Sequence, residues 1–167
     1  MVPDSIELLV LDIDGVLTDG AVTLTATGES SQTIHTQDGC AIKSWLKLGR
    51  SVAILSGRDN EPVSIRARQL GINCVRTGVT DKQAEFRNML RELGCDCGAV
   101  AYVGDDLPDL GTMRHCGFPV AVANALPAVK RAALFVTRRS GGRGAVAEVI
   151  ELLLRKQGQW AAVAHAG

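Results

Sequence analysis

The chain has few aromatic residues, no excess of charge and no long apolar run. Aromatic residues make up 4% of the 167 positions, which argues against a platform that stacks nucleic-acid bases. Lys and Arg together number 18, as do Asp and Glu, so no field of one sign attracts nucleic acid or an anionic membrane. No apolar run approaches the ~20 residues that span a bilayer. We therefore expect neither nucleic acid nor a membrane as a partner.

The cysteines and the N-terminal residues indicate the cellular compartment of the protein. The five cysteines are irregularly spaced, and one residue separates Cys95 from Cys97. This is neither the redox nor the zinc pattern, so reduced thiols that pack as small hydrophobes are the simpler interpretation. Residues 1–5 lack the basic region of a signal peptide. These features predict a cytoplasmic protein.

Apolar, β-branched runs alternate with helical stretches along the chain. The expected strands are 6–13, 52–55, 73–76, 99–103, 119–122 and 134–136. The expected helices are 41–48, 61–70, 81–93, 108–115, 126–132 and 144–156. This alternation predicts an α/β fold with a doubly wound parallel sheet that helices cover on both faces. The length fits a single domain over residues 1–167.

Two segments depart from this alternation. Residues 21–36 are rich in Thr and alternate on both sides of a Thr-Gly-Glu centre, which predicts a β-hairpin between the first strand and the first helix. The hairpin would rise over the carboxyl end of the sheet, where α/β folds bind ligands. A plain surface hairpin, whose strands would suit pairing with copies of itself, is the simpler alternative. Residues 157–167 are expected to form a flexible tail.

The most informative residues are two carboxylates at the end of the first expected strand. Asp12 and Asp14 follow the apolar run 8–11, and Gly15 comes directly after them. Alternate side chains of a strand point the same way, so two like charges would lie together at the end of a buried strand. A hard divalent cation, usually Mg²⁺, would neutralise them. An Asp-Gly turn is the simpler alternative.

Polar residues also follow the second and third expected strands. Ser56, Gly57 and Arg58 supply a hydroxyl, a flexible backbone and a guanidinium, which suit phosphate or carboxylate oxygens. Lys82 lies at a helix start, where anions are already favoured. Each also has a simpler interpretation: Ser56-Gly57 is a turn, and Lys82 is a solvated surface lysine.

A second acidic group follows the fourth expected strand. Asp105 and Asp106 come directly after Gly104, and Asp109 lies three residues further on. A turn followed by a helix cap is the simpler alternative. If the first strand is central and this strand lies beside it, both acidic groups meet at one point, and that many carboxylates require a metal ion.

Together these residues fit phosphoryl transfer. One carboxylate can be a nucleophile as well as a metal ligand, and Lys82 and Ser56 would hold the phosphate oxygens. Asp14 can protonate the leaving alcohol and then deprotonate water. Electrostatic stabilisation by the metal and these charges would supply most of the acceleration.

The four blocks, in this order, resemble the haloacid dehalogenase superfamily of phosphatases. The resemblance implies that Asp12 is the nucleophile and Asp14 the general acid and base, with Ser56 and Lys82 as further catalytic residues. It also implies that Mg²⁺ is bound by Asp12, by Asp14 through its backbone carbonyl, and by Asp105. Asp106 is expected beside the metal, directly or through water, and Asp109 in support.

Within that superfamily, the chain resembles the 3-deoxy-D-manno-octulosonate 8-phosphate phosphatases. The matching segments are 14–20, 38–39 with 42–43, 56–58 and 141–146, and a small hairpin replaces a cap domain. The resemblance implies a phosphorylated sugar acid of lipopolysaccharide biosynthesis as substrate, held by Ser56, Gly57, Arg58 and Lys82, with Arg58 on its carboxylate. It also implies a homotetramer in which a neighbouring subunit helps to exclude water from the site.

Three alternatives stay open at this point. The hairpin has fewer aromatic residues than is usual in that family, and Cys40-Ala41 stands in place of a glycine-containing pair, so a nonulosonate 9-phosphate is the alternative substrate. A receiver-like domain that accepts phosphate on Asp with Mg²⁺, or a binding module without activity, are alternatives from other classes. His35 lies at the hairpin exit, where an ordinary surface histidine is the simpler interpretation.

Overall fold

The computed structural model describes residues 3, 5–27, 30–59 and 61–164. Its strands are β1 (Leu8–Leu11), β2 (Thr23–Leu24), β3 (Ser30–Ser31), β4 (Ser51–Leu55), β5 (Cys74–Arg76), β6 (Val100–Gly104), β7 (Phe118–Ala121) and β8 (Phe135–Val136). Its helices are α1 (Thr36–Lys47), α2 (Glu61–Leu70), α3 (Lys82–Leu93), α4 (Leu110–Met113), α5 (Pro127–Ala132), α6 (Ala145–Lys156) and α7 (Trp160–Ala164). Three short turns are η1 (Ile13–Leu17), η2 (Cys97–Ala99) and η3 (Leu107–Asp109).

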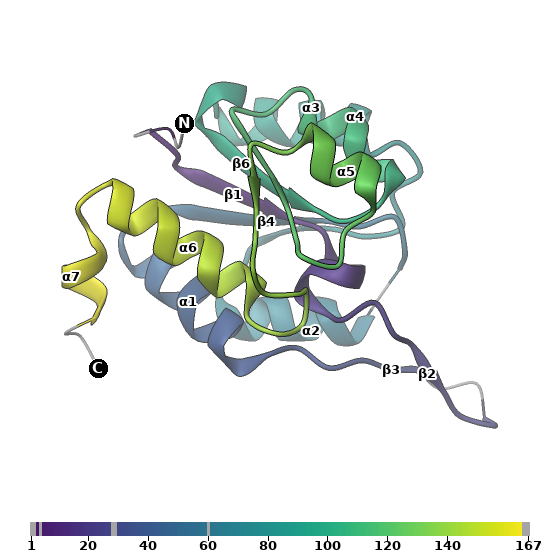
Figure 1. The fold of residues 1–167 in the computed structure, drawn as a ribbon. Helices are drawn as coiled ribbons and strands as arrows, with labels where there is room; N and C mark the ends of the chain where they lie inside the picture. Colours follow the sequence, from purple (N-terminus) through teal and green to yellow (C-terminus); the bar gives the residue numbers. More distant parts are fainter. Residues whose placement is uncertain (1–2, 4, 28–29, 60, 165–167) are drawn as a thin grey trace.

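Six of the strands form one parallel sheet in the order β5-β4-β1-β6-β7-β8. Helices α3, α4 and α5 cover one face, and α1, α2 and α6 cover the other (Figure 1). The strand β1 is central, between β4 and β6. This confirms the predicted doubly wound sheet, and each of the six strands overlaps an expected one.

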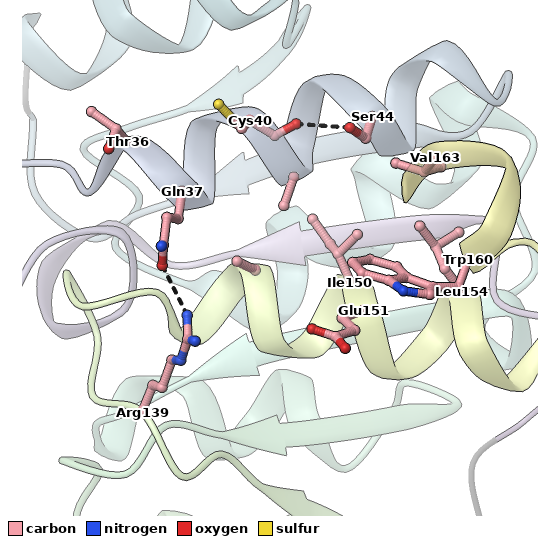
Figure 2. A pocket seen from close by; sticks show the side chains of 12 residues that line it. Thr36, Gln37, Cys40, Ser44, Arg139, Ile150, Glu151, Leu154, Trp160 and Val163 are labelled. Atoms are coloured by element: carbon pink, nitrogen blue, oxygen red, sulfur yellow. Dashed lines mark hydrogen bonds between the residues drawn. The ribbon is translucent and has the colours of Figure 1, made fainter. Parts of the chain in front are cut away.

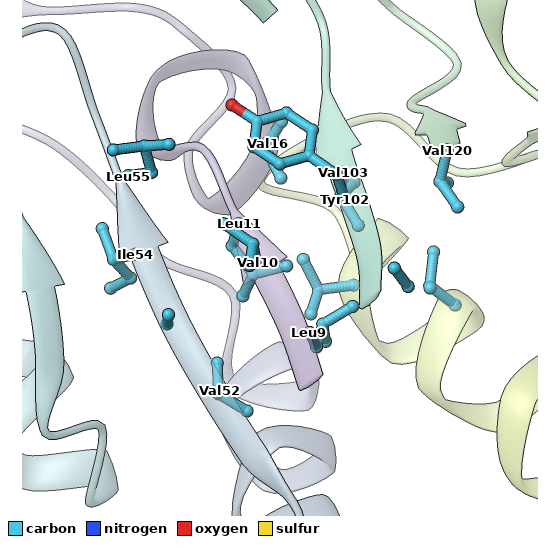
Figure 3. Packing of buried hydrophobic residues seen from close by; sticks show 14 of the residues in the cluster. Leu9, Val10, Leu11, Val16, Val52, Ile54, Leu55, Tyr102, Val103 and Val120 are labelled. Atoms are coloured by element: carbon cyan, nitrogen blue, oxygen red, sulfur yellow. The ribbon is translucent and has the colours of Figure 1, made fainter. Parts of the chain in front are cut away.

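The sheet interior explains why the expected strands could be recognised from apolar runs alone. All four residues of β1 are buried, as are four of the five in β4 and all five in β6. Figure 3 shows their side chains extending from both faces of β1, β4 and β6 into the helical layers. Burying a Leu, Ile or Val side chain contributes about 1.5–3 kcal/mol relative to leaving it exposed. Burial on both faces is what removes the polar alternation from these strands.

The helix α1 begins at Thr36, five residues before the expected start at residue 41. The side chain of His35 caps this helix by accepting a hydrogen bond from the backbone N–H of Gln37. Asp38 is fully buried, and its carboxylate accepts the N–H groups of Gly144 and Ala147 at the start of α6. The polar first turn of α1 is therefore a contact with α6, although in sequence it has the composition of a loop.

The predicted hairpin is present but short. The strands β2 and β3 pair antiparallel, with Thr23 opposite Ser31 and Leu24 opposite Ser30. Residues 28–29 of the expected Thr-Gly-Glu centre, 27–29, lie outside the described residues. The hairpin extends away from the body of the protein, beside the turn η1 and the start of α1 (Figure 1).

The expected flexible tail contains a helix that the sequence analysis missed. Trp160 and Val163 of α7 pack against the edge of the hydrophobic core, and the Arg155 guanidinium stacks over the Trp160 ring at 5.0 Å. The side chains of Trp160 and Val163 line one end of a pocket of about 380 Å³ between α1 and α6 (Figure 2). Residues 165–167 of the expected tail lie outside the described residues.

Two glycines allow the loop before α6 to lie against the turn η1. A Cβ atom on Gly141 would lie 1.7 Å from the carbonyl oxygen of Gly15 and 2.9 Å from that of Thr18. Both neighbours are backbone atoms, so neither can move aside as a side chain would. Gly142 has a φ of +65°, and its N–H donates to the carbonyl of Val16. The loop is thereby bonded to the segment that carries Asp12 and Asp14.

We expect Gly141→Ala to destabilise the protein by at least about 2 kcal/mol, because overpacking against backbone forces a shift. Gly111→Ala is the matched control, since its Cβ would meet the flexible Gln83 side chain at 3.4 Å. Urea unfolding followed by circular dichroism measures both changes. Equal stability of Gly141→Ala and wild type would contradict this packing.

Candidate active site

The polar residues expected after separate strands meet at one edge of the sheet. Asp12 follows β1, Ser56 follows β4 and Asp105 follows β6. Because β4 and β6 flank β1 in register, Ser56 and Asp105 lie on either side of Asp12. These residues and Lys82 line a pocket of about 280 Å³. Asp12 and Asp105 therefore lie close together, as expected from the sequence for the two acidic groups.

The turn η1 departs from helical geometry, and this departure directs its side chains. The Asp12 carboxylate accepts the N–H of Ile13 at 2.7 Å. Asp14 has an extended ψ of 121°, and Gly15 has a φ of +84°. A Cβ on Gly15 would lie 2.0 Å from the Asp105 carboxylate. Glycine is therefore required here both by the backbone conformation and by the close approach of Asp105.

Lys82 lies between two carboxylates beneath the pocket. Its Nζ is 2.9 Å from Asp12 Oδ2 and 2.8 Å from Asp109 Oδ1. The three side chains are buried. Burial opposes the charge of Lys82, but the two carboxylates outweigh it and raise its pKa. Lys82 is therefore a fixed cation, and the interpretation as a solvated surface lysine is wrong.

Asp109 has a structural role that the sequence analysis did not resolve. Its Oδ1 accepts from Lys82 Nζ and from the Tyr102 hydroxyl, at 2.8 and 2.7 Å. Its Oδ2 accepts the N–H groups of Asp105 and Asp106, at 2.9 and 3.2 Å. The carboxylate is fully buried, and its four donors occupy both oxygens. Asp109 therefore anchors Lys82 and the loop after β6.

The carboxylates of Asp12, Asp105 and Asp109 form a cluster that fits a hard divalent cation. Each offers an oxygen within 4.8 Å of the others. Burial raises the pKa of Asp12 to about 6, helped by the charge of Asp109 and opposed by Lys82. Burial, followed by the charge of Asp12, raises the pKa of Asp105 to about 7. Asp105 Oδ1 is buried and has no hydrogen-bond partner among the described residues. Four donors already occupy Asp109, so a cation would be held mainly by Asp105, whose Oδ1 lacks a partner in the described part of the chain. Asp12 would share it, because each of its oxygens accepts from a single donor in the described residues, the N–H of Ile13 or the Nζ of Lys82.

The other two expected metal ligands direct their side chains elsewhere. The Asp14 carboxylate accepts from Arg58 Nε and Nη2, at 3.1 and 2.8 Å, and also from Gln32 Nε2. Asp106 caps η3 by accepting the N–H of Leu107 at 2.7 Å. Both line the pocket. Their assignment as metal ligands, which for Asp14 concerns the backbone carbonyl, stays a prediction.

Asn124 also holds η1 in place, a role that was not predicted from the sequence. Asn124 Nδ2 donates to the carbonyl of Gly15 at 3.0 Å, and Asn124 Oδ1 accepts the N–H of Gly141 at 2.7 Å. Asn124 follows β7, so it lies at the same edge of the sheet as the acidic cluster. The only signal in the sequence was its position after an expected strand.

We expect Mg²⁺ to stabilise the protein more at pH 8 than at pH 5. In the metal-free protein, Asp12 and Asp105 have folded pKa values of about 6 and 7, above the ordinary 3.8. Their contribution to stability is therefore present below pH 4 and is lost as pH rises through 7. A cation binds the ionised carboxylates, and the stability that it adds grows with the logarithm of its affinity. Thermal unfolding with Mg²⁺ and with EDTA across this range measures the effect, and a Mg²⁺-induced shift in Tm that is equal at both pH values would contradict it.

Comparisons with known proteins agree with this geometry. Residues 75–150 match the family model of the haloacid dehalogenase-like hydrolases. The 3-deoxy-D-manno-octulosonate 8-phosphate phosphatase KdsC of Escherichia coli K12 is 42% identical over 93% of this chain and 83% of its own length. The crystal structure of that phosphatase from Yersinia pestis has a TM-score of 0.92 and 39% identity, covering 95% of this chain and 85% of the other.

A second solved structure contains ligands. The 3-deoxy-D-manno-octulosonate 8-phosphate phosphatase from Moraxella catarrhalis, in complex with a magnesium ion, a phosphate ion and KDO, has a TM-score of 0.93 and 34% identity. The similarity covers 95% of this chain and 91% of that one. The predicted resemblance is thus confirmed. The chain belongs to the 3-deoxy-D-manno-octulosonate 8-phosphate phosphatase family of haloacid dehalogenase-like hydrolases.

Proposed function

We propose that the protein is a Mg²⁺-dependent phosphatase that hydrolyses 3-deoxy-D-manno-octulosonate 8-phosphate. The observation that carries this proposal is the buried Asp12–Lys82–Asp109 arrangement beside Asp105, open to a pocket that Ser56 also lines. It combines a carboxylate nucleophile, a free carboxylate oxygen for a cation and a fixed positive charge. The magnesium, phosphate and KDO of the Moraxella catarrhalis relative support the same chemistry.

The reaction divides into two steps at Asp12. An oxygen of Asp12 attacks phosphorus, the ester P–O bond breaks, and the leaving oxygen takes a proton from the Asp14 carboxyl. Asp14 then takes a proton from water, whose oxygen attacks phosphorus, so that the Asp12–phosphate bond breaks and inorganic phosphate leaves. Mg²⁺ bound by Asp12, Asp105 and the carbonyl of Asp14 supplies charge neutralisation. Lys82 holds the phosphate oxygens together with Ser56.

Arg58 supplies the recognition of a sugar acid. It lies at the mouth of the pocket, with 43% of its side chain exposed, and a guanidinium binds a carboxylate with two parallel hydrogen bonds. A substrate carboxylate would compete with Asp14 for this guanidinium. A nonulosonate 9-phosphate presents the same two anionic groups, but the similar proteins favour the eight-carbon acid as substrate. No observation favours the receiver-like or the non-catalytic alternative.

The assembly and compartment of the protein remain predictions. The hairpin extends from the body (Figure 1) with Leu24 71% exposed, and a two-stranded ribbon with open edges suits pairing with other copies. We propose a homotetramer in which hairpins meet and neighbours help to close the site. Within the described ranges, no helix is both long and apolar enough to cross a membrane. We expect a cytoplasmic location for the enzyme.

Phosphate release from 3-deoxy-D-manno-octulosonate 8-phosphate, measured with Mg²⁺ and with EDTA, tests the proposal. We expect turnover only with Mg²⁺, and turnover of a hexose 6-phosphate that lacks a carboxylate to be much slower. A stable phosphoprotein without turnover would favour the receiver-like alternative. Absence of phosphate release from both esters would contradict the proposed phosphatase activity.

A further inference from the structure

A polar side chain next to the hairpin contacts Asp14, the proposed general acid. Gln32 directly follows β3, and its Nε2 donates a hydrogen bond to Asp14 Oδ1 across 18 positions of sequence. The contact joins the inserted hairpin to the residue that transfers the proton in the proposed reaction. We propose that Gln32 is a positioning residue that holds the Asp14 carboxyl toward the leaving group, an inference that rests on the proposed function.

The backbone around Gln32 is fixed on both sides. Ser31 pairs with Thr23 in the hairpin. Ile34 packs against the hydrophobic core, and His35 caps α1. Gln32 thus lies in the short connection between β3 and α1. Its half-buried side chain can therefore hold Asp14 in a defined direction.

The chemistry of an amide differs from that of the guanidinium on the other side of Asp14. Arg58 donates to both oxygens of Asp14, through Nη2 to Oδ1 and through Nε to Oδ2. That pairing is strongest with an ionised carboxylate, because a proton on Oδ2 weakens its acceptance from Nε. Gln32 donates to Oδ1 of Asp14, and a carboxyl that carries its proton on Oδ2 still accepts at Oδ1. Gln32 can therefore hold Asp14 both before and after proton transfer.

The two donors also have different tasks when substrate binds. Arg58 is exposed at the pocket mouth, and a substrate carboxylate would draw it away from Asp14. A neutral amide has no net charge to draw it to the substrate carboxylate, so Gln32 remains as the partner of Asp14 at the moment of reaction. A side chain 29% exposed, as that of Asp14 is, would otherwise be free to rotate.

Dependence on the leaving group distinguishes this role from a general structural one. A sugar alkoxide needs a proton as it leaves, whereas p-nitrophenolate leaves without one. The ratio kcat/KM reports only the steps through departure of the leaving group. We expect Gln32→Ala to lower kcat/KM roughly tenfold for 3-deoxy-D-manno-octulosonate 8-phosphate and less than about twofold for p-nitrophenyl phosphate, since general acid catalysis contributes about 10²–10⁴-fold in total.

Two further variants make the test decisive. Ser31→Ala, at the neighbouring hairpin position, should leave both values within about twofold of wild type. In an Asp14→Asn background, Gln32→Ala should have no further effect, because residues that act as a unit are not additive. An equal loss with both substrates, or full additivity, would overturn the inference while the proposed function stands. A wild type that cleaves neither ester would overturn the proposed function and the inference with it.

Discussion

Asp12→Asn should reduce phosphate release by at least about 10³-fold, because the amide removes the nucleophile of the first step. The variant should remain folded. Burial and then the charge of Asp109 raise the pKa of Asp12, so both oppose its ionisation. Lys82 keeps Asp109 as its partner when Asp12 is neutral. In EDTA, we therefore expect a Tm for Asp12→Asn at or above that of wild type.

Steady-state phosphate release and thermal unfolding measure the two effects together. Asp59→Asn is the matched control, since Asp59 is exposed and accepts a hydrogen bond from the Thr77 hydroxyl. It should retain wild-type activity. Retention of more than a tenth of the activity by Asp12→Asn would show that this carboxylate is not the nucleophile.

Asp109→Ala should lower the free energy of unfolding by about 3–5 kcal/mol, even without metal. The change leaves Lys82 with a single carboxylate partner and removes the acceptor of the Tyr102 hydroxyl and of two backbone N–H groups. Breaking a buried ion pair from one side costs this much because buried polar groups are left unpaired. Urea unfolding in EDTA measures the change.

Stability measured without metal distinguishes two roles for Asp109, an anchor for Lys82 and a metal ligand. Tyr102→Phe removes one of the four donors to Asp109 and should cost about 1 kcal/mol. If Asp109 served chiefly as a metal ligand, its removal in EDTA would relieve repulsion with Asp12 and Asp105. Unchanged or increased stability of metal-free Asp109→Ala would therefore contradict the role as an anchor.

Much of the fold follows from local composition. The strands β1, β4 and β6 are predictable because burial on both faces leaves continuous apolar runs. The helix α2 has the expected bounds, 61–70. The start of α1 was not predictable, because Asp38 is polar yet fully buried, and its partners at the start of α6 lie more than 100 positions away. The missed helix α7 likewise depends on packing by Trp160.

The site was predictable where residues follow strands and unpredictable where side-chain direction matters. Asp12, Ser56 and Asp105 meet because the carboxyl ends of parallel strands share one edge of the sheet. The sequence alone did not specify that Asp109 would hold Lys82, because this depends on the path of the loop after β6. The contacts of Asp14 with Arg58 and Gln32 depend on an irregular turn and an inserted hairpin, so local patterns contain no information about them.

A competition between two substrates tests the central claim most directly. The protein is incubated with Mg²⁺ and equal concentrations of 3-deoxy-D-manno-octulosonate 8-phosphate and a nonulosonate 9-phosphate, and mass spectrometry follows both. The relative rates of disappearance give the ratio of the two kcat/KM values. We predict that the eight-carbon acid is consumed first and that EDTA stops its loss. Consumption of the nine-carbon acid first would contradict the substrate, and consumption of neither would contradict the activity.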